Sequence, residues 1–176
     1  MTNLCYVATI GLEFDEKSSK SEFSEVLKMD VIKEFYSTAD EYCCFISESE
    51  ITDDSIPVLM ELLMKLYISA VNLPEIEPET IVEYSTEETE FPSVRVSSQI
   101  PQFYWEVFDP LKKDDLVCGD LIDDLSDISI DLKSGITEYE AGRIGNAVFE
   151  WRFGLDNHWG MHAVDLLRAL HAIRTR

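Results

Sequence analysis

Two histidines and an aspartate near the C-terminus have the spacing of a metal-binding helix face. His158 and His162 are four residues apart, and Asp165 follows three residues later. One face of a helix would therefore present two imidazoles and a carboxylate, a set that can chelate a divalent metal ion. The segment lacks the glutamate that stands between the two histidines of zinc peptidases.

A second set of carboxylates repeats at helical intervals upstream. Its members fall at steps of four, three and four residues: Asp120, Asp124, Asp127 and Asp131. They share one helix face beside an apolar stripe, and carboxylates this close repel each other unless a cation or an arginine compensates them. If this helix packs against the histidines, the predicted metal ligands are Asp124, Asp127, His158, His162 and Asp165.

The same residues also have a structural interpretation, and the sequence favours it. His162 lies on an apolar stripe beside Trp159, where a hydrogen-bonded histidine is common, and no third ligand is fixed by nearby sequence. The aspartates can instead be compensated by Arg143, Arg152 or Arg168. We expect Arg152 to be held by an aspartate of this stripe, and we expect no cofactor other than a possible divalent metal.

One long amphipathic helix is predicted to organise the fold. Its apolar stripe advances in steps of three or four residues through Ile144, Val148, Trp151, Leu155, Trp159, His162, Leu166, Leu170 and Ile173. Glycine loosens a helix by about 1 kcal/mol relative to alanine, so Gly154 and Gly160 predict a kink or a close crossing with another helix. Trp151 and Trp159 are expected to be structural core residues.

Four principal helices predict an all-α bundle in a single domain over residues 1–176. Besides the long helix, apolar stripes predict helices over 21–49 and 57–73, and a third from Gly119 that stops at Gly135. A short aromatic helix over 100–111, containing Trp105, is expected to seal one end of the core. The predicted core comprises Phe35, Leu63, Leu66, Leu125, Trp151, Leu155 and Leu166.

Two segments carry no helical pattern. Residues 1–20 are left as an arm of uncertain structure. Residues 74–101 contain four prolines, and seven glutamates lie between Glu75 and Glu90. This composition predicts a long acidic loop that docks through scattered apolar residues and is a candidate lid or partner surface.

The net charge limits the classes of molecule that the protein is expected to bind. The chain has 14 basic and 35 acidic residues and a net charge of -21, which repels phosphate backbones and anionic membranes and favours cationic partners. Four cysteines without metal or disulfide spacing, no convincing signal peptide and no membrane span predict a soluble cytoplasmic protein. We expect no nucleic-acid or membrane partner.

The combined motifs resemble a bacterial family catalogued only as a domain of unknown function. They are Trp105-x-x-Phe-Asp-Pro110, the run from Asp123 to Lys133, Glu150-Trp-Arg-Phe-Gly, His158-Trp-Gly-x-His162 and Arg168-Ala-Leu-His171. The resemblance covers about residues 100–173 and implies a bacterial, cytoplasmic helical domain. It implies no activity, cofactor or catalytic residue.

Two functions from different classes follow. The first, which the net charge favours, is a non-enzymatic interaction protein of the inhibitor or immunity type that binds a basic protein partner through its acidic surface. Trp105, Trp151, Arg152 and Trp159 are its candidate structural or partner-binding residues. The alternative is a metal-dependent hydrolase-like protein with an Asp/His site in the bundle, which requires two helices to align.

Overall fold

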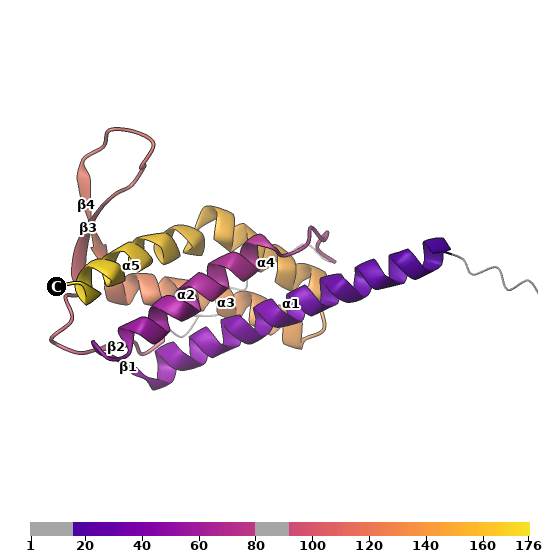
Figure 1. The fold of residues 1–176 in the computed structure, drawn as a ribbon, viewed down its shortest axis with the longest axis horizontal. Coiled ribbons are helices and arrows are strands. Elements are labelled where there is room, and N and C mark those ends of the chain that lie inside the picture. Colours follow the sequence, from indigo (N-terminus) through magenta and orange to yellow (C-terminus); the bar gives the residue numbers. More distant parts are fainter. Residues whose placement is uncertain (1–15, 80–91) are drawn as a thin grey trace, which may run out of the picture.

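A computed structural model describes residues 16–79 and 92–176. In this part of the chain the elements run α1 (Glu16–Glu48), β1 (Glu50–Ile51), α2 (Ile56–Val71), β2 (Arg95–Val96), β3 (Phe103–Val107), β4 (Leu116–Asp120), α3 (Leu121–Glu140), α4 (Ile144–Asn157) and α5 (Trp159–Arg174). The predominantly helical fold is as predicted, but the two small sheets are not (Figure 1). The expectations for 1–15 and for 80–91 lie outside the described residues.

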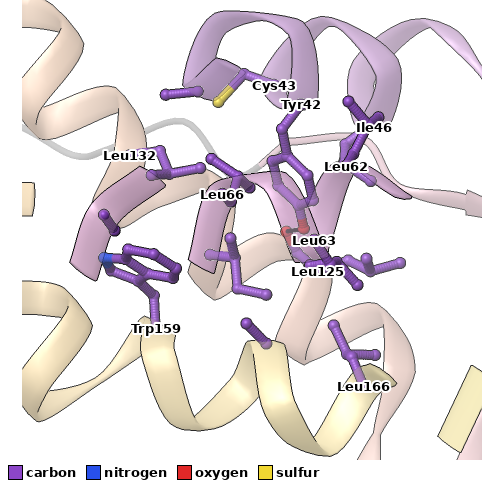
Figure 2. Close-up of a cluster of buried hydrophobic side chains, with 14 of the residues drawn as sticks. Tyr42, Cys43, Ile46, Leu62, Leu63, Leu66, Leu125, Leu132, Trp159 and Leu166 are labelled. Atoms are coloured by element: carbon purple, nitrogen blue, oxygen red, sulfur yellow. Dashed lines mark hydrogen bonds between the residues drawn. The ribbon is translucent and has the colours of Figure 1, made fainter. Parts of the chain in front are cut away.

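The helices enclose one apolar core. Helix α1 packs against α2 and α3, and α5 packs against α2, α3 and α4. The predicted core residues are buried, except that Leu155 is only partly so. Tyr42 of α1 reaches into this core and donates a hydrogen bond from its hydroxyl to the Leu125 carbonyl at 3.3 Å (Figure 2). The apolar stripes on separate helices therefore meet as the sequence predicts.

The predicted single long helix is instead two helices, α4 and α5, which meet at His158. The break lies between Gly154 and Gly160, where the sequence predicts a kink or a close crossing. The two glycines near this junction allow close approach. A Cβ on Gly160 would lie 2.1 Å from the Leu155 carbonyl oxygen, and one on Gly154 would lie 2.6 Å from the Trp159 ring. The chain therefore turns sharply here while Trp151 and Trp159 both stay fully buried.

The prediction that this helix stops at Gly135 is wrong, because α3 continues to Glu140. Gly135 is instead the surface on which the Trp151 indole lies, since an added Cβ would come within 2.1 Å of its Nε1. The same Nε1 donates a hydrogen bond to the Leu132 carbonyl at 3.1 Å. This glycine serves helix packing and not helix termination.

The predicted aromatic helix over 100–111 is also wrong. Residues 103–107 form β3, which pairs in antiparallel register with β4, so that Tyr104 faces Gly119 and Trp105 faces Cys118. Aromatic and β-branched residues favour strands, and alternation turns Trp105 outward, where it is 66% exposed. The hairpin projects from the bundle instead of sealing its core (Figure 1).

The described ends of the acidic loop are anchored to the bundle. The Glu79 amide donates to Asn146 Oδ1 at 2.9 Å, and the Gly145 amide donates to Glu79 Oε1 at 3.1 Å. At the other end β2 pairs in parallel with β1. In this part of the chain no helix combines the length and the apolar character that crossing a membrane requires.

Candidate metal centre

Helix α3 contains three of the four aspartates of the acidic stripe, and the fourth, Asp120, is the last residue of β4. Asp120 is the N-cap of the helix and accepts a hydrogen bond from the Ile122 amide at 2.9 Å. It also accepts from Gln102 Nε2 at 3.0 and 3.2 Å. Asp120 therefore has a structural role, and the three aspartates one to three turns further along the helix face the histidines.

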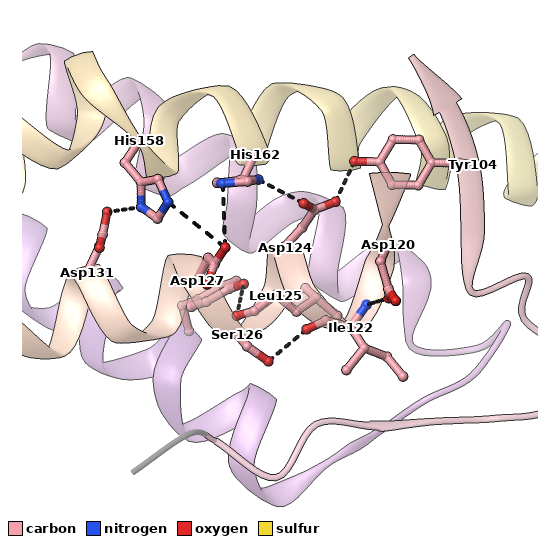
Figure 3. Close-up of polar contacts among 11 residues, drawn as sticks. Tyr104, Asp120, Ile122, Asp124, Leu125, Ser126, Asp127, Asp131, His158 and His162 are labelled. Atoms are coloured by element: carbon pink, nitrogen blue, oxygen red, sulfur yellow. Dashed lines mark hydrogen bonds and ion pairs between the residues drawn. The ribbon is translucent and has the colours of Figure 1, made fainter. Parts of the chain in front are cut away.

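Asp124 fixes one of these imidazoles. Its side chain is buried, and its Oδ1 lies 2.8 Å from His162 Nδ1. Its other oxygen, Oδ2, accepts a short hydrogen bond from the Tyr104 hydroxyl, which comes from strand β3 (Figure 3). An imidazole whose Nδ1–H donates to a carboxylate keeps its lone pair on Nε2.

Asp131 fixes the second imidazole in the same way. His158 stands at the junction between α4 and α5, and its Nδ1 lies 2.9 Å from Asp131 Oδ2. The two histidine rings lie edge to face with centroids 4.9 Å apart. Both imidazoles thus have a carboxylate behind Nδ1 and turn Nε2 to the same place.

That place is occupied by one oxygen of Asp127. Its Oδ2 lies 3.9 Å from His158 Nε2 and 3.7 Å from His162 Nε2 (Figure 3). One donor atom from each of the three side chains lies within 4.8 Å of the others. Donor atoms around a tetrahedral zinc ion, with bonds of about 2.1 Å, stand about 3.4 Å apart. Side-chain shifts of about 1 Å would bring Asp127 Oδ2, His158 Nε2 and His162 Nε2 to the spacing of ligands around one zinc ion.

The electrostatics of this cluster suit a cation. Burial and the neighbouring Asp123 raise the pKa of Asp127, while both histidines act to lower it. The hydrogen bond to Asp124 raises the pKa of His162, against the opposing effect of burial. Three carboxylates and two imidazoles therefore require positive charge, which either protons or a divalent metal can supply.

Asp165, the fifth predicted ligand, lies outside the cluster. Its carboxyl lies close to that of Glu106 of β3, and burial raises the pKa of Asp165. Burial and Asp165 raise the pKa of Glu106 to about 7. This carboxyl pair joins the hairpin to α5 and supplies no donor to the three-residue cluster.

The prediction that Arg152 pairs with the acidic stripe is wrong. Its guanidinium donates a short hydrogen bond to the Leu73 carbonyl, just beyond the C-terminus of α2. Its Nη2 also lies 3.7 Å from Oε1 of the exposed Glu75. Arginine is favourable at a helix C-terminus because the last carbonyls carry partial negative charge. Arg152 therefore ties α4 to α2 on another side of the bundle.

The other two candidate arginines do not compensate the stripe either. Arg143 binds Glu138 through two nitrogens at 2.6 and 2.8 Å. Arg168 lies near Asp165 of its own helix, where its charge partly opposes the burial that raises the pKa of that carboxyl. The partners of the aspartates are the histidines instead.

Two contributors to the cluster are absent from the predicted ligand set. Asp131 belongs to the acidic stripe, and its spacing of four from Asp127 was a usable signal. Tyr104 gave no such signal, because it reaches Asp124 only through the pairing of β3 with β4.

The fold and this cluster define a helical-bundle protein with a histidine and aspartate site between α3 and the α4–α5 junction. The chain belongs to the family described as Domain of unknown function (DUF5063), whose model matches residues 27–176. A similar solved structure is that of protein BF1032 from Bacteroides fragilis, with a TM-score of 0.62 and 20% sequence identity over 83% of this chain and 96% of that chain. At this identity the likeness shows the fold alone. No curated protein matches the chain.

Proposed function

We propose that the protein binds one divalent transition-metal ion through Asp127 Oδ2, His158 Nε2 and His162 Nε2. The observation that carries this proposal is the pair of carboxylates behind the imidazoles. Asp131 and Asp124 each hold an Nδ1, at 2.9 and 2.8 Å, so that both Nε2 atoms face Asp127. A histidine that ligates a metal commonly donates its second nitrogen to a carboxylate in this manner.

The donor set narrows the choice of ion. Two imidazoles and one carboxylate suit zinc, iron or manganese better than calcium or magnesium, which prefer oxygen ligands. Three protein ligands leave at least one coordination position open, and the His158 side chain is 49% exposed. An open position at a partly exposed site is a feature of catalytic zinc centres. It supports the hydrolase-like function more than a closed structural site would.

The competing interpretation is an ion-pair cluster without metal. Two protonated imidazoles between three aspartates would satisfy the same contacts and would join α3 to α5. The two interpretations differ in what the purified protein retains.

Metal analysis of the purified protein tests the proposal. We expect about one zinc, iron or manganese ion per chain after dialysis against buffer with a low concentration of the metal salt, and we expect a cobalt-substituted sample to show the visible absorption of a low-coordinate site. His162→Ala should lose the ion. His171→Ala is the matched control, because it removes an exposed imidazole from the same helix outside the cluster. Circular dichroism confirms that each variant is folded.

Equal metal content in wild type and His162→Ala would overturn the proposal, as would a wild-type chain that retains no ion under these conditions. In the second case the ion-pair interpretation stands.

An interaction function is the second candidate, and a specific observation favours it. Several large apolar side chains of the β3–β4 hairpin are exposed on a chain with a net charge of -21. An exposed apolar group of this kind commonly marks a protein interface, and the charge favours a basic partner. Mixing experiments with basic and acidic protein ligands at low and high salt test it, because binding to a basic ligand alone should weaken as salt rises.

A further inference from the structure

We propose that the outer surface of the β3–β4 hairpin binds a basic protein segment that carries apolar side chains. We call this the hairpin surface, and it consists of five exposed residues: Phe103, Trp105, Phe108, Leu111 and Leu116. This inference rests on the interaction function given above as the second candidate. It does not depend on the metal centre.

The hairpin is held to the bundle by its opposite face. The Tyr104 hydroxyl donates to Asp124, and the Tyr104 ring lies over Gly119, where an added Cβ would come within 2.5 Å of it. At the base of the hairpin the Leu121 amide donates to the Gln102 carbonyl at 2.9 Å. Because side chains alternate along a strand, fixing Tyr104 inward turns Phe103 and Trp105 outward.

The outward side chains have no cover in the described part of the chain. Trp105 is 66% exposed and Leu111, beyond the end of β3, is 93% exposed. Trp151 and Trp159, by contrast, are fully buried. Aromatic residues are enriched at the centres of protein interfaces, where they supply large apolar area at a small cost in conformational entropy. A surface with these residues on an anchored hairpin fits a docking site.

The charge of the whole chain selects the partner. Near the hairpin surface, Asp109, Asp114 and Asp115 stand beside two lysines, and Lys112 forms an ion pair with Asp109 at 2.6 Å. The whole chain carries -21, so two copies would repel each other when their hairpins meet. A basic segment is attracted by the same field. We therefore assign the surface to a basic partner and not to a second copy.

The strand edges indicate how that segment is held. The sheet of β3 and β4 has two strands, so each strand has one edge without a strand partner among the described residues. An extended segment can add to such an edge through backbone hydrogen bonds while its alternate side chains contact the exposed apolar residues. The expected ligand alternates basic and apolar residues.

Selection from a library of random short peptides displayed on phage tests the inference with the full chain as bait. We expect the enriched peptides to carry net positive charge and to alternate basic with apolar residues. Their affinity should fall at least tenfold for Trp105→Ser. Ile68→Ser is the matched control, since Ile68 of α2 is also 66% exposed but lies outside the hairpin. Asp114→Lys combined with Asp115→Lys should weaken the same peptides by reversing local charge.

Each other outcome has a defined meaning. If basic peptides bind Trp105→Ser as tightly as the wild type, the hairpin is not the binding surface. The interaction function itself would still be supported. Enrichment of acidic or neutral peptides would overturn the assignment of a basic partner. If no peptide is enriched, the inference fails. Wild-type dimers that dissociate in Trp105→Ser on sedimentation would then assign the surface to a second copy.

Discussion

His162 Nδ1 lies 2.8 Å from Asp124 Oδ1, and this contact decides which imidazole nitrogen faces the histidine and aspartate cluster. In the neutral imidazole that keeps its proton on Nδ1, the Nε2 lone pair would point towards Asp127. Asp124 in turn is held by Tyr104 of the hairpin. The orientation of a candidate ligand on α5 therefore depends on a buried aspartate of α3 and on a tyrosine from β3.

The first prediction concerns this orienting carboxylate. Asp124→Asn should reduce metal affinity by about 10- to 100-fold without removing a ligand, because carboxylates behind ligating histidines typically contribute that much. Titration with zinc and a competing chelator measures it. Asp54→Asn is the control, because Asp54 is an exposed aspartate between β1 and α2, outside the cluster. Equal affinities for the two variants would show that Asp124 does not orient a ligand.

The second prediction concerns the core between α1, α2, α3 and α5. Leu66→Ala and Leu125→Ala each remove a fully buried side chain and should lower the free energy of unfolding by about 2 to 5 kcal/mol through cavity formation. Urea denaturation followed by circular dichroism measures the loss. Val58→Ala, at an exposed position of α2, should change stability by less than about 1 kcal/mol. Similar effects at all three positions would contradict this core.

The helical stripes were predictable from sequence because burial imposes a periodic pattern on each helix. Phe35, Leu66 and Trp151 come from different helices, yet each was assigned to the core from its own local spacing, and all three are fully buried. The grouping of Asp127 with His158 and His162 required in addition that α3 lie beside the α4–α5 junction. The spacing of residues in the sequence identifies the candidate ligands, but it cannot show that these helices are in contact.

The failures have a common physical cause. Gly135 is predicted from local backbone preference to end a helix, whereas its surroundings are set by the Trp151 indole. Residues 103–107 were assigned to a helix because their aromatic content suggested a core, but pairing with β4 makes them a strand. Long-range contacts override local propensity in both cases.

The third prediction concerns Gly135→Ala, because helix propensity and side-chain packing predict opposite changes in stability for this substitution. Alanine in an exposed helix interior would stabilise by about 1 kcal/mol over glycine. At position 135 the added Cβ would lie 2.1 Å from Trp151 Nε1, so Gly135→Ala should destabilise the protein by about 1 to 3 kcal/mol through overpacking. Thermal unfolding and the fluorescence of the displaced Trp151 measure this. A rise in melting temperature would show that the indole does not lie on Gly135.

The last prediction concerns the carboxyl pair that joins the hairpin to α5. Burial, together with Asp165, raises the pKa of Glu106 from 4.5 to about 7. One of its oxygens, Oε2, is buried without a hydrogen-bond donor in the described part of the chain, a position that disfavours a charged carboxylate. A carboxyl with a raised folded-state pKa stabilises the fold most at low pH. That contribution is lost as pH rises through about 7.

Glu106→Gln keeps a neutral side chain at every pH, so it isolates this effect. Relative to the variant, the wild type should lose stability between pH 4.5 and about 7 and change little above that range. Urea denaturation across this range measures the difference. Glu140→Gln, at an exposed residue of α3, is the control for the loss of one acidic charge. A difference between wild type and Glu106→Gln that stays constant with pH, or that changes equally for Glu140→Gln, would show that Glu106 titrates as an ordinary carboxylate.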